Sequence, residues 1–144
     1  MGTIQRFEDL QVWKKARAFS KDVFQLTQTG LFAKDYELKG QINRSAGSIM
    51  DNIAEGFERS GKAEFINFLT ISKGSCAETR SQLYRAFDRN YLDEITLKKF
   101  LTEGEEVGKM LSGFITYLNK TEVAGIKFKD RVKASQSSTL NSKL

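Results

Sequence analysis

Apolar residues recur every three or four positions along four long stretches of the chain. The clearest stretch, 41–57, carries one apolar and one polar row at the same spacing. In a helix of 3.6 residues per turn, each row lies along one face. The pattern predicts an amphipathic helix with one core face and one face that hydrogen-bonds to a neighbouring helix or a partner. The apolar row is Leu38, Ile42, Ala46, Ile49, Ile53 and Phe57, and the polar row is Gln41, Ser45, Ser48, Asn52, Glu55 and Arg59.

Three further stretches repeat the helical period. One begins at Phe7 and continues to about residue 26, and one runs from about residue 62 to 90 with small residues in the middle of its core row. The last covers about 94–118 with a nearly heptad spacing, which is typical of knobs-into-holes packing. Asp35 and Asp93 precede two of the four stretches, where a carboxylate accepts hydrogen bonds from free backbone N–H groups, so we expect both to cap helices.

Four long helices with short connections predict an all-α fold, an antiparallel up-down-up-down four-helix bundle. We expect 1–6 to be a flexible leader, 7–122 the bundle, and 123–144 a basic, Ser-rich, disordered tail. The sequence contains no proline, so nothing in it forces a kink in a long helix. No apolar run is long enough to span a membrane, and no signal segment opens the chain, so we expect a cytoplasmic protein with no membrane partner.

Composition argues against catalysis. The sequence has no histidine, which removes the commonest general base and the commonest metal ligand. Its one cysteine, Cys76, falls in a core row and has no histidine to activate it. The di-metal carboxylate motif of helical bundles, Glu-x-x-His, is absent. We therefore expect no enzymatic activity, no cofactor, no metal and no small-molecule substrate.

The net charge of +5 belongs mostly to the end of the chain. Residues 1–122 carry 18 basic and 17 acidic side chains, whereas residues 123–144 carry five and one. A strongly basic body of the kind that binds nucleic acid by net charge alone is therefore absent. Any nucleic-acid surface on the body has to come from local clustering of cations.

Two motifs carry a family resemblance. FEDLQVW at 7–13 and SIMDNIAEG at 48–56, supported by further matches in order and spacing to about residue 118, resemble the four helix bundle protein family. That family includes proteins encoded in intervening sequences of bacterial 23S rRNA genes. Its members are similar to the accessory variability protein of diversity-generating retroelements, a pentameric barrel that binds a reverse transcriptase and RNA. The resemblance implies a homopentamer assembled as a barrel, with no known enzymatic activity. The family often has proline near Ala33 and at Met50, where this chain has none.

Two sets of residues are candidates for contacts with partners. Cations along the helices could face phosphates once several copies surround an axis, or they could form a solvated face with ion pairs such as Glu55–Arg59. A second set could join subunits; alternatively Trp13 and Phe24 lie in the core of one chain, and Asn52 and Glu55 bond across helices. The nucleic-acid set is Arg44, Arg59, Lys73, Arg80, Arg85 and Arg89, and the subunit set is Trp13, Phe24, Asn52 and Glu55.

The sequence leaves two functional hypotheses. In the first, a non-catalytic homo-oligomeric bundle binds RNA or DNA, or a nucleic-acid enzyme, through an assembled basic surface. In the second, the bundle is a scaffold that binds only protein, and its charges keep it solvated. A partner complex that survives nuclease treatment would favour the second.

Overall fold

The computed structural model describes residues 4–121, which form four long α-helices, two short 3₁₀ helices and no strand. The all-α class with four helices is therefore confirmed. Residues 1–3 of the expected leader, and the expected tail at 123–144, lie outside the described residues. The elements are η1 (Phe7–Asp9), α1 (Gln11–Leu26), η2 (Phe32–Lys34), α2 (Tyr36–Glu58), α3 (Lys62–Asp88) and α4 (Glu94–Lys120).

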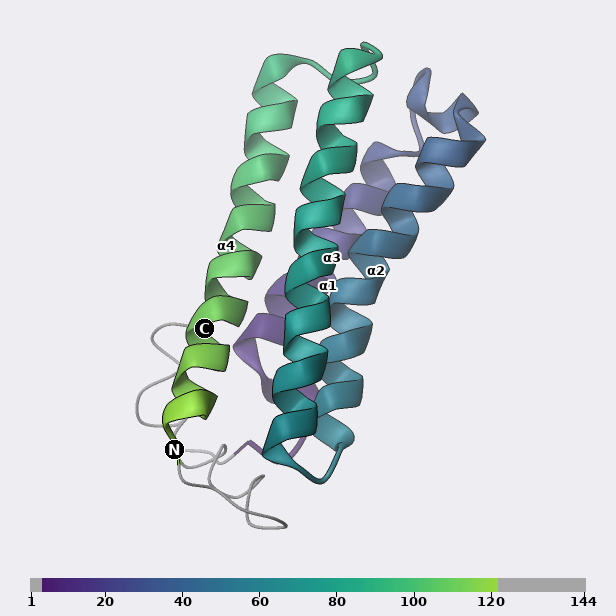
Figure 1. Cartoon of the computed structure of the whole chain (residues 1–144). Helices are drawn as coiled ribbons and strands as arrows, with labels where there is room; N and C mark the ends of the chain where they lie inside the picture. The colour runs from purple at the N-terminus through teal and green to yellow at the C-terminus, as the bar shows by residue number, and fades with distance from the viewer. Residues whose placement is uncertain (1–3, 122–144) are drawn as a thin grey trace.

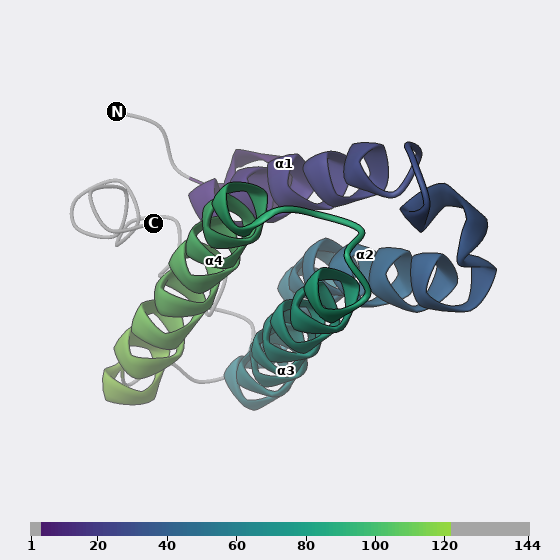
Figure 2. The ribbon, with the colours of Figure 1, turned by 90° about the horizontal axis from the view of Figure 1, so that it is seen from above.

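The long helices lie side by side, with the α2–α3 turn at one end and the α3–α4 turn at the other (Figure 1). Seen from above, they occupy four corners in chain order, and α1 neighbours both α2 and α4 (Figure 2). Of the four pairs of neighbouring long helices, α2 and α3 pack most extensively and α1 and α4 least. None of the described helices is both long enough and apolar enough to cross a lipid bilayer.

Both predicted aspartate caps are confirmed. Asp35 Oδ1 accepts from the Leu38 N–H at 3.1 Å, and Asp93 Oδ1 accepts from the Thr96 N–H at 2.8 Å. These backbone hydrogen bonds favour the ionised carboxylates and lower the pKa of Asp35 and of Asp93. Asp35 also accepts from the Tyr91 hydroxyl at 2.8 Å, which ties the start of α2 to the end of α3.

The predicted start of the first helix at Phe7 is wrong. Phe7 opens a 3₁₀ turn, Leu10 is extended with φ −71° and ψ 127°, and α1 begins at Gln11. Tertiary packing explains the break, because the bend buries Leu10 completely and lets the Phe7 ring meet Trp13 edge-on at 5.2 Å. The third helix likewise ends before the predicted residue 90, at Asp88.

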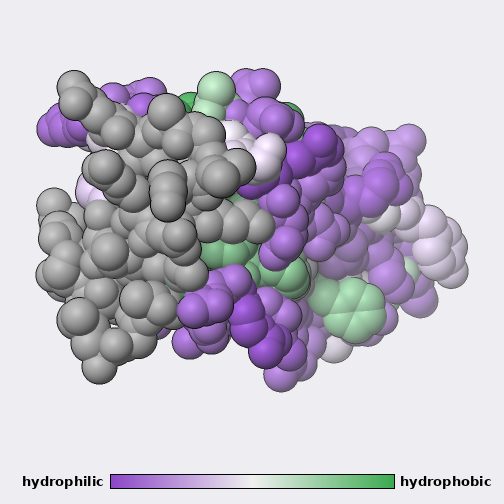
Figure 3. Space-filling view, turned by 90° about the horizontal axis from the view of Figure 1, so that it is seen from below, coloured by the Kyte–Doolittle hydropathy of each residue, from purple (hydrophilic) through white to green (hydrophobic). Residues whose placement is uncertain are grey.

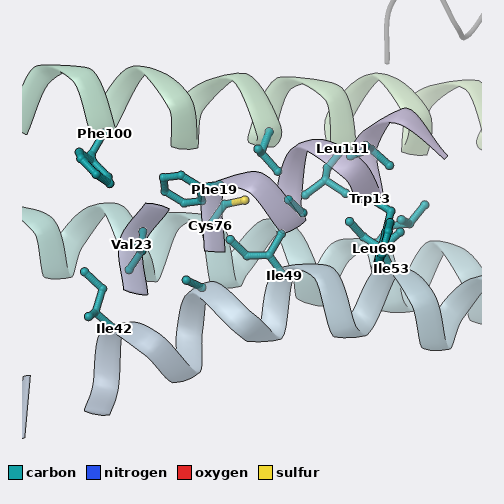
Figure 4. Close-up of a cluster of buried hydrophobic side chains, with 14 of the residues drawn as sticks. Trp13, Phe19, Val23, Ile42, Ile49, Ile53, Leu69, Cys76, Phe100 and Leu111 are labelled. Atoms are coloured by element: carbon teal, nitrogen blue, oxygen red, sulfur yellow. The ribbon is translucent and has the colours of Figure 1, made fainter. Parts of the chain in front are cut away.

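The apolar rows of the four helices meet in one continuous core (Figure 4). Every residue of the predicted apolar row of α2 is fully buried. Seen from below, the described part of the surface is mostly hydrophilic, with apolar groups between hydrophilic ones at the centre (Figure 3). Core side chains labelled in Figure 4 are Trp13, Phe19 and Val23 of α1, Ile42, Ile49 and Ile53 of α2, Leu69 and Cys76 of α3, and Phe100 and Leu111 of α4.

Candidate functional site

The polar row of α2 faces α3 over most of its length. Ser45 donates to Gln82 Oε1 at 2.6 Å, and its hydroxyl lies 2.8 Å from that of Thr79. One turn away, Ser75 donates to the Ser48 hydroxyl at 3.0 Å. We call this set of buried and half-buried contacts the polar seam; it also includes Ser72 to the Ile49 carbonyl at 2.8 Å and Arg85 to Gln41 Oε1 at 2.8 Å. The first half of the polar row therefore joins two helices of one chain.

The next two residues of the row, Asn52 and Glu55, bond to other residues of the row and not to α3. Asn52 donates to the Ser48 carbonyl and hydroxyl at 2.8 and 2.9 Å, within α2. Glu55 is exposed and pairs with Arg59 at 2.7 Å. The prediction that Asn52 and Glu55 bond across helices of the chain is thus wrong, whereas their role between subunits stays a prediction.

Trp13 and Phe24 differ in environment, although both lie on α1. Trp13 is only 8% exposed and belongs to the core, with Arg17 over its ring at 5.6 Å. Phe24 is 54% exposed. The core alternative is therefore confirmed for Trp13, and Phe24 remains an apolar group on the surface of the protomer.

Three of the six candidate nucleic-acid contacts already have partners within the chain. Arg59 pairs with Glu55 and lies 3.5 Å from Glu64, so the predicted Glu55–Arg59 pair is confirmed. Arg89 pairs with Asp35 at 2.7 Å, and Arg85 belongs to the polar seam. The hydrogen bonds to Glu55 and Asp35 raise the pKa of Arg59 and of Arg89 respectively. These three cations are engaged before any ligand arrives.

The other three candidates, Arg44, Lys73 and Arg80, form no ion pair with any residue in 4–121. Arg44 is exposed on α2 beside a small polar hollow of about 220 Å³. Lys73 and Arg80 lie on α3 and line a larger groove of about 570 Å³ between α3 and α4. We call it the α3–α4 groove; Cys76 and Ala77 of α3 and Glu105, Gly108, Lys109 and Ser112 of α4 complete its lining.

Sequence reasoning missed Lys109. On its own helix it is one exposed lysine among several, and only the packing of α4 on α3 brings it to the same groove as Lys73 and Arg80. The signal available was the pair Gly104 and Gly108, one turn apart on α4, since small residues let a facing helix or a long side chain approach closely.

The stem of Arg80 is held between the helices. A Cβ at Gly104 would lie 3.1 Å from Arg80 Cγ and 3.2 Å from Phe19 Cζ, so glycine there makes room for both side chains. The Arg80 Nε–H is buried and has no hydrogen-bond acceptor among the described residues. A buried donor without an acceptor is unusual in folded proteins.

Cys76 adds no charge to this groove at neutral pH. Its side chain is 1% exposed, and burial raises the pKa of the thiol to about 12 despite the nearby charge of Arg80. Because the nucleophile is the thiolate, a thiol of this kind is inert. Among residues 4–121 no cluster of three or more His, Cys, Asp or Glu side chains could hold a metal ion.

The family of this protein is shown by a match between the chain and a family model. Residues 8–113 match the model of the 23S rRNA-intervening sequence protein family. The chain belongs to this family. The resemblance carried by the motifs at 7–13 and 48–56 is thereby confirmed.

A solved structure shares the fold. A protein of unknown function from the S23 ribosomal protein family of Bacteroides thetaiotaomicron aligns with a TM-score of 0.67 and 26% identity. The alignment covers 76% of this chain and 99% of that one. No curated protein matches the chain.

In this member of the family, both motifs contribute residues to the core. Val12 and Trp13 of the first motif and Ile49 and Ile53 of the second are buried in the core. Gly56 closes the second motif at a close approach of α3, since a Cβ there would lie 2.6 Å from Phe68 Cβ. The motifs that reveal the family thus specify the bundle, and surface chemistry has to be sought elsewhere.

Proposed function

We propose that this protein is a non-catalytic RNA-binding bundle whose antiparallel up-down-up-down protomers assemble into a homo-oligomeric barrel, a homopentamer. The observation that carries the proposal is the cluster of three cations at the α3–α4 groove, Lys73, Arg80 and Lys109, which form no ion pair with the described residues 4–121. The family is named for an intervening sequence of 23S rRNA, and RNA is therefore the nucleic acid we propose. The protein would act in the cytoplasm, alone or beside a nucleic-acid enzyme.

A ring of copies strengthens a weak local charge. Three cations per protomer, repeated around an axis, give a surface whose potential exceeds that of one nearly neutral body. Phosphate contacts of this kind depend strongly on salt, because binding releases counterions from the nucleic acid. Exposed apolar residues such as Phe24 (54%) and Tyr36 (79%) supply candidate contacts between subunits.

The test is RNA binding across a salt series. Fluorescence anisotropy would compare the full chain, a chain ending at residue 122, and the full chain with Lys73→Glu and Arg80→Glu. We expect the double variant to lose most of its affinity while its oligomeric state, measured by light scattering, is unchanged. Loss of binding with the tail alone would instead attribute the affinity to five basic residues outside the bundle.

A matched control makes the same change in charge at two positions outside the groove. Arg59→Glu with Arg89→Glu reverses two cations that already pair with Glu55 and Asp35. These two substitutions should affect RNA binding less than the groove pair. An equal loss in both double variants would mean that overall charge, and not the groove, drives binding.

A protein-binding scaffold is the second candidate. Its support is that half of the candidate cations are engaged within the chain, while large apolar side chains such as Leu31 (61%) and Ile95 (82%) are exposed. This function predicts a partner complex that resists nuclease and a protein that binds neither RNA nor DNA.

A further inference from the structure

We propose that the α3–α4 groove of each protomer is a phosphate-binding site that holds one phosphodiester of the RNA backbone. Arg80 would be the main ligand, with Lys73 and Lys109 on either side. This inference rests on the RNA-binding function proposed above and goes further, because it places the contact inside one protomer and not between copies.

The charge of the groove favours an anion. Three cations and one carboxylate, Glu105, line it, and the thiol of Cys76 stays neutral. Lys73 and Arg80 make no ion pair within residues 4–121, and neither does Lys109. A phosphate oxygen that enters therefore displaces no existing partner from any of the three.

Arg80 is suited to hold such an oxygen. Its stem lies against Gly104 of the facing helix, so the side chain loses little further freedom when it binds. Its planar guanidinium presents several donors that match phosphate oxygens two at a time. Since the Nε–H has no acceptor in the described part of the chain, a small adjustment of the side chain toward a bound oxyanion would satisfy it.

The groove has room for a ligand. Its volume of about 570 Å³ falls within the usual range of ligand sites. Gly108 forms part of the wall, and a Cβ at this position would meet no atom within 4 Å. The space above Gly108 is therefore open, and a side chain placed there would occupy the groove without displacing the helix.

This openness allows a test that leaves every charge in place. Gly108→Leu fills the groove, and Gly113→Leu makes the same change elsewhere on α4, at an exposed glycine whose Cβ also meets nothing within 4 Å. Both variants gain helix propensity, so neither should unfold the protein. Binding of the full chain to a fluorescent RNA hairpin would be measured by anisotropy, with oligomeric state checked by light scattering.

A second pair of variants tests the ligand itself. Arg80→Gln removes the proposed donor, and Lys21→Gln removes an exposed cation of α1 outside the groove. We expect Gly108→Leu and Arg80→Gln each to weaken RNA binding roughly tenfold, and Arg80→Gln to reduce the slope of log K against log salt by about one. Gly113→Leu should bind as the unsubstituted chain does.

Each outcome decides between the proposals. If the unsubstituted chain binds RNA but Gly108→Leu matches Gly113→Leu, the groove is not the site and the RNA-binding function stands. If Arg80→Gln and Lys21→Gln weaken binding equally, the contact is a diffuse charge effect and the groove is again excluded. If the unsubstituted chain binds no RNA, both the function and the site are overturned.

Discussion

The two hollows on either side of α4 have opposite chemistry. On the α3 side, Lys73, Arg80 and Lys109 outnumber Glu105. On the α1 side, a hollow of about 260 Å³ is lined by three carboxylates and one lysine: Asp22, Glu103 and Glu106 with Lys15. We call it the α1–α4 hollow. One helix thus separates a surface that attracts anions from one that repels them.

One carboxylate of the α1–α4 hollow, Glu103, has a raised pKa. Burial raises the pKa of Glu103, and the neighbouring charge of Asp22 raises it further. Lys15 lies 3.6 Å from Glu106 and offsets part of the charge. The interface between α1 and α4 is also the least extensive of the four between neighbouring long helices. A body whose net charge is nearly balanced thus carries one basic and one acidic surface. Four predictions test this difference.

The largest effect concerns the thiol in the basic groove. With a pKa of about 12, Cys76 should react with a disulfide reagent at about pH 8 roughly a thousand times more slowly in the folded protein than in the urea-unfolded chain. The measurement is the rate of colour release under both conditions. Similar rates would show an accessible thiolate, which would place a negative charge in the groove.

The next effect concerns the glycine between the two hollows. Gly104→Leu should lower the free energy of unfolding by about 1–3 kcal/mol, because the new side chain meets Arg80 on one side and Phe19 on the other. Urea denaturation would measure it, with Gly113→Leu as the matched control. The control should gain up to about 1 kcal/mol from helix propensity, and a Gly104→Leu variant that gains as much would show that both neighbours yield freely.

A smaller effect sharpens the difference in charge. Glu105→Gln removes the carboxylate that lines the α3–α4 groove, so RNA should bind about two- to threefold more tightly. Glu106→Gln, on the other side of α4, removes the same charge from the α1–α4 hollow. A binding titration that finds the same gain in both variants would argue for a general charge effect.

The smallest effect concerns stability against pH. Because the folded-state pKa of Glu103 is raised, the folded protein loses stability as pH rises from the ordinary glutamate pKa through the raised value. Glu103→Gln should therefore raise the melting temperature near neutral pH and change it little in acid. The accompanying gain in the free energy of unfolding should stay below about 1 kcal/mol, since solvent screens the charge of a partly exposed group. An equal gain at both pH values would contradict this origin.

The sequence predicted best what depends on one helix alone. The apolar row from Leu38 to Phe57 is buried at every position, and Asp35 and Asp93 cap as expected, because periodicity and capping act within a few residues. The start at Phe7 was wrong because burial of Leu10 in the core overrides the local preference for a helix.

The candidate site was harder to predict because it depends on which helix faces which. Residues of one row on α2 have different environments: Ser45 hydrogen-bonds to Gln82 of α3, whereas Glu55 is exposed. Likewise Arg59 is neutralised by residues on its own and the next helix, and Lys109 joins Arg80 only through packing. Spacing along one helix carries no information about the rotation of its neighbour.

The polar seam has a consequence for the axial position of the helices. Two purely apolar surfaces can slide along each other by one turn, about 5.4 Å, and still bury hydrocarbon. Such a shift of α3 along α2 would separate Ser45 from Gln82 and Ser48 from Ser75, so the buried Gln82 Oε1 would lose its hydrogen-bond donor. The seam therefore fixes the axial position of α3 along α2. As a result, Lys73 and Arg80 lie at the same axial position in every copy of the protein.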